Sequence, residues 1–258
     1  LDDGTIYPYS SKLPKYVREA VETVVESGDS EVRDGNVHLD LSEFSVKEVE
    51  LFRDFTVGFC GELIDRLDDA RKDSHVVVDE FDDSIPKVSL NNIGTEHSKD
   101  IVRIEAQVQD LGKPTVHNLT AKWECQNSHT TTKRYHRWVD VLETPVQCGE
   151  DGCLDRPTDR IANVGTQIDV QQLVLSETNK DDRNSRNLIA EIDEPLIGEF
   201  DRRDTVEVLA QVQIADRANE SKVEPYLHIF GFKPVGHTID LTSQRVNELT
   251  ELVDESDD

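Results

Sequence analysis

Methionine is absent from the chain, and basic residues are scarce, since 28 lysines and arginines stand against 54 aspartates and glutamates. No apolar run approaches the ~18 residues of a membrane-spanning helix, and the first residues lack the charged-then-apolar pattern of a secretory signal. These absences exclude an integral membrane protein, and we expect no membrane partner. Because Leu1 is not a translational start, we expect the chain to be processed or cut from a longer one.

The net charge of −26 is spread over the whole chain of 258 residues rather than gathered in a tail. An unscreened field of this sign repels nucleic acid and anionic membranes, so the charge indicates either cationic partners or a very salty cytoplasm. At ~1 M salt the Debye length falls to ~3 Å, and global charge then no longer selects partners. Few lysines and many aspartates favour the second interpretation, which predicts a cytoplasmic, nucleoid-associated protein of a high-salt cell.

The first third of the chain, residues 1–92, is expected to be a helical domain. Ser45 and Glu48 have the S-x-x-E spacing of a capping box, and the apolar residues that follow recur at helical spacing. The expected elements are helices over 16–25 and 49–67 and a short extended piece over 37–41.

Near residue 100 the hydrophobic period changes to two, which is typical of half-buried strands. Five such strands with turn residues between them predict a small barrel or sandwich, and the whole chain an α+β protein. We expect a five-stranded barrel over 93–122 and 159–238, with a polar module inserted at 123–158 and a linker over 239–258. The expected strands are 102–108, 168–175, 188–192, 206–214 and 226–232.

The inserted module contains the pattern of a metal site. Cys125 and His129 form C-x3-H, and Cys148 and Cys153 form C-x4-C eighteen residues later. Two short-spaced pairs of this kind supply the four tetrahedral ligands of zinc. We therefore expect a structural Zn²⁺ in a zinc-ribbon-like module.

Three alternatives to this ligand set remain open from the sequence. Cys148 and Cys153 can form a disulfide that leaves Cys125 free, although nothing in the sequence indicates secretion. His136 can replace His129 as the fourth ligand. A catalytic zinc is disfavoured because it requires an open coordination position, and Cys60 lies within an apolar helical stripe that indicates a core position.

The segment 177–187 separates two expected strands and carries no net charge in a strongly acidic chain. Its cations, Lys180, Arg183 and Arg186, are candidates for contacts with DNA phosphates, because such contacts need a cation at the point of contact whatever the total charge. An ordinary solvated hairpin tip explains the same composition equally well.

Other chemistry has weaker signals. The segment 133–138 interleaves basic and aromatic residues, as in single-strand binding, but small zinc modules also use aromatics as their core, and the second interpretation is favoured. The chain has no Walker A motif, no G-x-G-x-x-G and no G-x-S-x-G. We therefore expect no catalytic residues in this chain.

The order of these parts, and the residues within them, resembles the N-terminal region of archaeal minichromosome maintenance (MCM) replicative helicases. The similar segments include the first barrel strand, both halves of the metal module, the strand and exit of the basic hairpin, and a late strand block. They are IVRIEAQV (101–108), KWECQNSH (122–129), CGEDGC (148–153), DVQQLVLSE (169–177), RNL (186–188) and LIGEFDRRDTVEVLAQV (196–212).

This resemblance implies a helical domain A, an OB-type barrel and a zinc module that together assemble a homo-hexamer or double ring around single- or double-stranded DNA. Lys180, Arg183 and Arg186 would then face the channel, and other replication factors would dock on the ring. The family's usual Pro-Arg and Gly-Asp pairs are replaced by Ser185-Arg186 and Arg203-Asp204. The ATP-binding AAA+ half of such a helicase is missing from this chain.

Two further hypotheses belong to other functional classes. The first is a stand-alone OB-fold and zinc protein that binds single-stranded DNA, of the replication protein A kind, which needs no ring. The second is an interaction module that recruits basic partners through its acidic surface and does not bind DNA. Ring formation separates the helicase hypothesis from the first, and DNA binding at high salt counts against the second.

Overall fold

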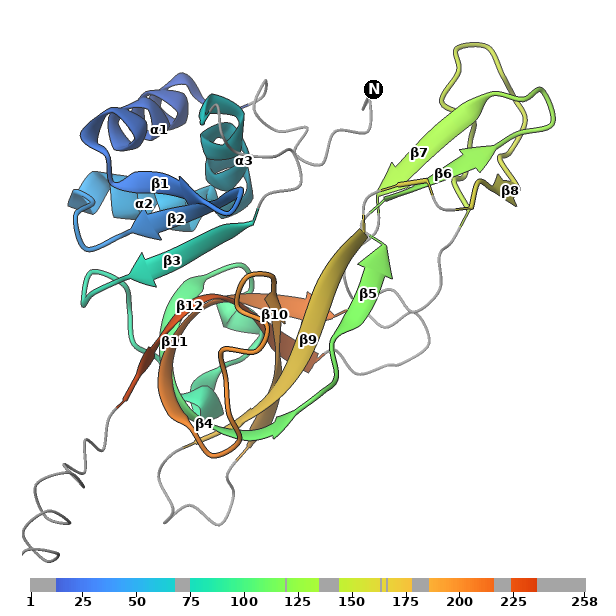
Figure 1. Ribbon diagram of the computed structural model, residues 1–258. Helices are drawn as coiled ribbons and strands as arrows, with labels where there is room; N and C mark the ends of the chain where they lie inside the picture. Colours follow the sequence, from blue (N-terminus) through green and yellow to red (C-terminus); the bar gives the residue numbers. More distant parts are fainter. Residues whose placement is uncertain are drawn as a thin grey trace, which may run out of the picture.

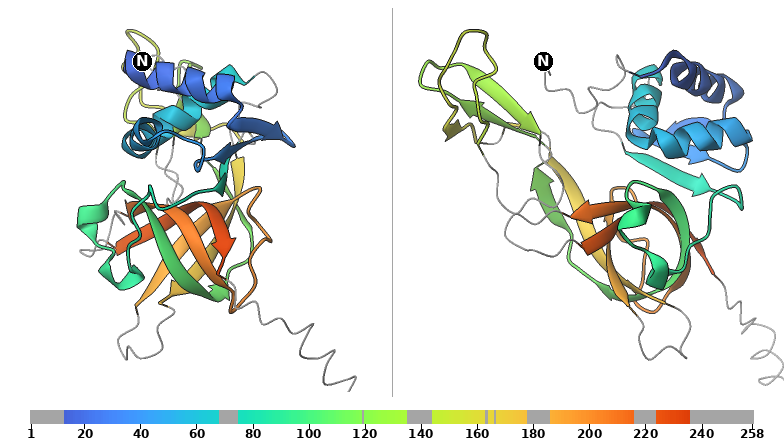
Figure 2. Two further views of the ribbon diagram at one scale, coloured as in Figure 1. Left: turned by 90° about the vertical axis from the view of Figure 1, so that its left-hand side faces the viewer. Right: turned by 180° about the vertical axis from the view of Figure 1, so that it is seen from behind.

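The structure of the chain is a computed structural model, shown in Figure 1, and it confirms an α+β protein with a largely closed sheet. The residues that it describes are 13–67, 75–118, 120–134, 144–162, 164–165, 167–177, 186–215 and 224–235. They form an N-terminal part, a barrel, and a small module beyond the ends of β5 (Thr115–Asn118) and β9 (Gln167–Ser176) (Figures 1 and 2).

The N-terminal part combines three helices with a three-stranded sheet, so it contains more strand than the single extended piece that the sequence predicted among its helices. The sheet has the order β1-β2-β3, with β1 antiparallel and β3 parallel to β2, and β2 confirms the expected extended piece. The elements are α1 (Lys15–Ser27), β1 (Ser30–Arg33), β2 (Asn36–Asp40), α2 (Val46–Asp54), α3 (Thr56–Arg66) and β3 (Val76–Glu80).

The expected second helix is divided in two. The capping box at its start is present, because Ser45 accepts from the Glu48 N–H while the Glu48 carboxylate accepts from the Ser45 N–H. Phe55 then leaves the helical conformation (φ −128°, ψ 28°) and α3 begins in a new direction. The hydroxyl of Thr56 donates to the Phe52 carbonyl at 2.8 Å, which satisfies a carbonyl near the end of α2.

All five expected strands are present and form a closed circuit. β4 pairs with β9 and β11, β9 with β10, and β11 with β12, all antiparallel, and the parallel pair of β10 with β12 closes the ring. A sixth strand, β5 (Thr115–Asn118), pairs with β9 beyond the ring. The barrel strands are β4 (Ile101–Leu111), β9 (Gln167–Ser176), β10 (Asn187–Asp193), β11 (Thr205–Ala215) and β12 (Glu224–Pro234).

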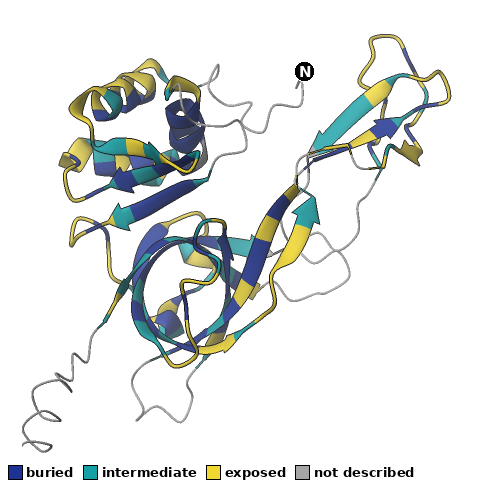
Figure 3. Ribbon diagram, in the orientation of Figure 1, coloured by how far each residue is buried: buried dark blue, intermediate teal, exposed yellow. Residues whose placement is uncertain are grey.

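Strand β3 is shared between the two larger parts of the molecule. Val76 and Val78 are buried in the N-terminal core, whereas Val77 is buried in the barrel core. Strand β3 also lies against β12. There is no room for a side chain at Gly231 on β12, because a Cβ at this position would overlap the carbonyl oxygen of Val78. Figure 3 shows buried residues on both sides of this strand, so β3 lies between the two cores and contributes side chains to each.

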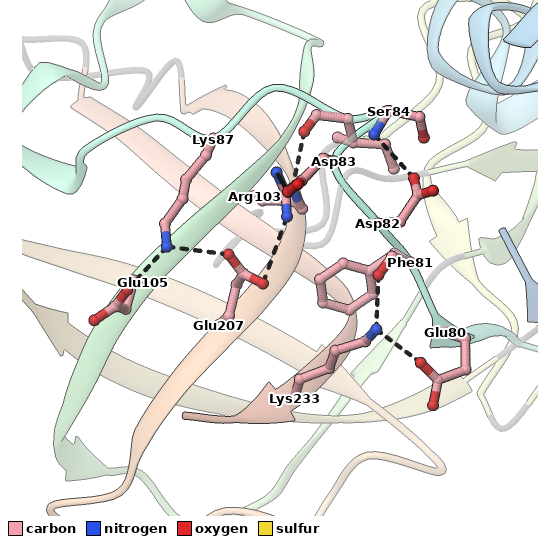
Figure 4. Close-up of polar contacts among 11 residues, drawn as sticks. Glu80, Phe81, Asp82, Asp83, Ser84, Lys87, Arg103, Glu105, Glu207 and Lys233 are labelled. Carbon is pink, nitrogen blue, oxygen red and sulfur yellow. Dashed lines mark hydrogen bonds and ion pairs between the residues drawn. The ribbon is translucent and has the colours of Figure 1, made fainter. Parts of the chain in front are cut away.

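The connector from β3 to β4 is fastened to the outside of the barrel by ion pairs (Figure 4). Arg103 on β4 is buried, and its guanidinium donates to Asp83 at 2.7 Å and to the Ile85 carbonyl at 2.8 Å. Lys87 lies between Glu105 at 2.9 Å and Glu207 at 3.3 Å, and these carboxylates raise its pKa. The connector is therefore held along most of its length.

The inserted module has a sheet of its own, with the order β7-β6-β8. Its strands are β6 (Thr120–Glu124), β7 (Thr130–Arg134) and β8 (Asp159–Arg160), so the sheet extends a few residues beyond the expected 123–158 at both ends. In the part of the chain that the structure describes, no helix has the length and apolar character that crossing a membrane requires. The expected linker at 239–258 lies outside the described residues.

Candidate functional site

The first metal-binding pair is formed by the turn between β6 and β7. Cys125 follows β6 directly and His129 precedes β7. The Ser128 N–H donates to the Cys125 carbonyl at 2.9 Å, and the Cys125 N–H donates to the His129 carbonyl at 3.1 Å. Ser128 has a left-handed conformation (φ 61°) that reverses the chain within this short spacing. The turn thus brings the Cys125 thiol and the His129 imidazole close to each other.

The second pair is formed by a knuckle in the long loop after β7. The Cys153 N–H donates to the Glu150 carbonyl at 3.1 Å, and Gly152 between them takes the positive φ of 80° that a glycine tolerates best. The hydroxyl of Thr131 on β7 accepts from the Gly149 N–H at 2.9 Å, which fastens the knuckle to the sheet.

These two turns bring the four predicted ligands together. One ligand atom from each of Cys125, His129, Cys148 and Cys153 lies within 4.8 Å of all the others, and the three sulfurs are buried. All three cysteines are free thiols, so the Cys148–Cys153 disulfide is not formed. The group can hold a metal ion with His129 as the fourth ligand. The alternative ligand, His136, lies outside the described residues.

The surroundings of the thiols favour metal binding unequally. The Asp155 backbone N–H, followed by the His129 ring, lowers the pKa of Cys153 to about 7. Burial raises the pKa of Cys125 above its ordinary value. The Asn127 amide donates to the Cys153 sulfur at 3.7 Å and to the Asp155 carboxylate at 2.6 Å. Asn127 therefore helps to orient the Cys153 thiol from outside the group of four ligands.

Of the three predicted DNA-contacting cations, the structure describes Arg186 and not Lys180 or Arg183. Arg186 precedes β10 at the base of the loop, and its guanidinium Nη1 donates to the Ile93 carbonyl at 2.6 Å. On the other leg of the loop, the Glu177 carboxylate accepts from the Asn91 N–H at 3.2 Å. Sequence reasoning missed these contacts because they join positions 86 to 93 residues apart.

The second basic and aromatic cluster is described only in part. Lys133, on β7, donates to the Thr144 carbonyl at 3.4 Å. The segment 135–143, which contains its aromatic residues, lies outside the described part of the chain.

Comparison with known proteins places the chain in no family. No protein-family model matches it, and no curated protein matches it.

Proposed function

We propose that the chain is the non-catalytic N-terminal part of an MCM-type replicative DNA helicase, which assembles the ring and binds single-stranded DNA within it. The observation that carries this proposal is the combination of a five-stranded circuit with a Cys3His module inserted between its first two strands. The resemblance of the sequence over the same segments supports the same assignment.

The order of pairing supports an OB-type barrel. Counted within the ring, the first strand (β4) pairs with the second (β9) and fourth (β11), and the third (β10) pairs with the fifth (β12) in parallel. OB folds are five-stranded Greek-key barrels, and they bind oligonucleotides on the face of their second and third strands and on the loops that join strands one to two and four to five. In this chain that face is formed by β9 and β10, which the loop 178–185 connects.

The metal in the module is proposed to be zinc with a structural role. Zn–S bonds of about 2.3 Å place two sulfurs of a tetrahedral site about 3.8 Å apart, and the sulfurs of Cys125 and Cys153 are 3.9 Å apart. The apolar cluster on the module's sheet consists of Ala121 and Trp123 alone among the described residues. A metal ion would supply the stability that so small a core lacks.

Contact with DNA is assigned to the cations of the loop between β9 and β10, where Lys180 and Arg183 are the proposed phosphate ligands. In a salty cell the gain from released counterions is small, because log affinity falls linearly with log salt. The contacts must therefore be short, charge-assisted hydrogen bonds together with base stacking.

Size-exclusion chromatography with light scattering in multimolar KCl, with zinc measured on the same peak, tests the assembly. A ring-sized species with about one zinc per chain supports the proposal. A monomer that binds single-stranded DNA would instead favour a stand-alone OB-fold protein, and a protein without metal would overturn the assignment of the module.

Fluorescence anisotropy with labelled single-stranded DNA over a range of KCl concentrations tests the contacts. A Lys180→Ala, Arg183→Ala double variant should bind more weakly. The slope of log affinity against log salt concentration, here called the salt slope, should become less steep by about 0.7 for each phosphate contact removed. Lys15→Ala is the matched control, since Lys15 is an exposed cation on α1. An unchanged affinity and slope in the double variant would rule out the loop as the DNA contact.

A further inference from the structure

The loop between β9 and β10 is fastened at both legs to one turn of the connector. On the first leg, the Glu177 carboxylate accepts from the Ser89 hydroxyl at 3.1 Å and from the Asn91 N–H at 3.2 Å. On the second leg, the Arg186 N–H donates to the Asn91 side-chain carbonyl at 3.0 Å, and its guanidinium donates to the Ile93 carbonyl at 2.6 Å. We call these four hydrogen bonds the latch.

The latch begins where the strand ladder ends. The last pair between β9 and β10 joins Ser176 to Asn187, so Glu177 and Arg186 are the first residues that the sheet no longer holds. Beyond this pair, the two ends of the loop have no strand ladder to hold them. The latch attaches each end of the loop to the connector in addition to its strand.

The turn that receives the latch is itself fixed. Leu90 and Ile93 are fully buried in the barrel core, so the turn plugs one end of the barrel. Just before it, the Val88 N–H donates to the Arg103 carbonyl at 2.9 Å, and Lys87 is paired with β4 and β11 (Figure 4). The turn that receives the latch is therefore attached to the barrel both through its core and through its strands.

The guanidinium of Arg186 is half-buried and engaged with the protein backbone. A charge-assisted hydrogen bond of 2.6 Å to a carbonyl is strong, and releasing it to bind a phosphate would leave the Ile93 carbonyl without this donor. We propose that Arg186 is a positioning residue that, with Glu177 and Asn91, holds the two ends of the loop between β9 and β10 against the connector, and that it does not contact DNA phosphate. This inference rests on the proposed DNA binding.

Asn91 allows a test without any change of charge. Asn91→Ala removes the acceptor of the Arg186 N–H, and Asn92→Ala is the matched control, since Asn92 is an exposed neighbour in the same turn. Amide hydrogen exchange without DNA should quicken at residues 176–177 and 186–188 by about tenfold or more in Asn91→Ala and Arg186→Ala. It should stay unchanged in Asn92→Ala.

Binding of single-stranded DNA over a range of KCl concentrations completes the test. If Arg186 only positions the loop, Asn91→Ala and Arg186→Ala should both weaken binding severalfold and leave the salt slope unchanged. A loss of about 0.7 from the slope in Arg186→Ala, with Asn91→Ala binding normally, would identify Arg186 as a phosphate contact and overturn the inference.

The two proposals fail separately. If the intact chain binds no DNA at any salt concentration, the proposed function fails, and the hydrogen exchange still shows whether the latch holds the loop. If the chain binds DNA but exchange at the loop base is the same in all variants, the latch is wrong and the proposed function stands.

Discussion

At the scale of single residues, the four cysteines have different chemistry because their surroundings differ. Burial raises the pKa of Cys60 to about 12, which keeps this thiol protonated and inert. In the metal-binding group, backbone N–H donors and the His129 ring lower the pKa of Cys153 to about 7. Cys60 is thus a core residue, as its position in an apolar stripe predicted, and Cys153 is prepared to act as a ligand.

Replacement of one ligand should empty the metal site. Cys148→Ser should reduce bound zinc from about one per chain to near zero, because three ligands hold a structural zinc far more weakly than four. Elemental analysis of the purified protein measures this directly. Cys60→Ala is the control, and it should retain its zinc; equal zinc in both variants would contradict the ligand assignment.

The stability of the chain should depend on Cys60 in alkali. The unfolded thiol ionises near its ordinary pKa of 9.0, whereas the folded thiol stays protonated up to about 12. A folded pKa above the unfolded one contributes stability that is intact below pH 9 and is lost as the pH rises, by about 1.4 kcal/mol per unit.

Chemical denaturation of the natural chain and of Cys60→Ala between about pH 8 and 11 measures this loss. The difference in unfolding free energy between them should shrink above pH 9. A constant difference would mean that Cys60 ionises as easily in the folded protein as in the unfolded one.

The sequence predicted that Cys125, His129, Cys148 and Cys153 come together, because each pair lies within one short turn and local spacing is enough to bring two of these side chains together. The structure adds that the His129 ring lies with the three sulfurs, while His136 lies outside the described residues. The latch was not predictable, since neither Asn91 nor Arg186 has any local pattern that indicates a partner about ninety residues away.

At the scale of elements, strands with a clear alternation of apolar and polar residues, such as β4, were predicted, whereas β3, which is buried on both sides, was missed. β4 alternates apolar and polar residues over 102–108, which gives the period of two. β3 has the continuous run Val76 to Val78, because its two faces contact two different cores, and such a run has no period. The break at Phe55 was also hidden, since apolar spacing continues through it.

The close approach of β3 to β12 should make Gly231 intolerant of any side chain. Gly231→Ala would push the Val78 carbonyl away and should lower the unfolding free energy by about 2 kcal/mol or more, as overpacking typically does. Thermal or chemical unfolding measures the change. Gly149→Ala is the matched control, because its added methyl would meet Thr131 at an ordinary 3.6 Å and should change stability little.

At the scale of the whole molecule, the net charge of −26 opposes the folded state at low salt. Self-repulsion among carboxylates falls as salt shortens the Debye length. The melting temperature, followed by circular dichroism, should therefore rise steadily from dilute to multimolar KCl. An uncharged osmolyte at equal osmolality is the control, and an equal rise in both would mean that screening is not the cause.

The insertion between β4 and β9 has a consequence for how the chain folds. These strands are neighbours in the barrel, but the whole metal module lies between them in sequence, so their pairing must close a long loop at an entropic cost. If the proposed zinc binds first, the module holds Cys125 and Cys153 within 3.9 Å and thereby shortens that loop. We therefore expect the module to fold first and the barrel to close afterwards, so that zinc supply governs how fast newly made chains mature.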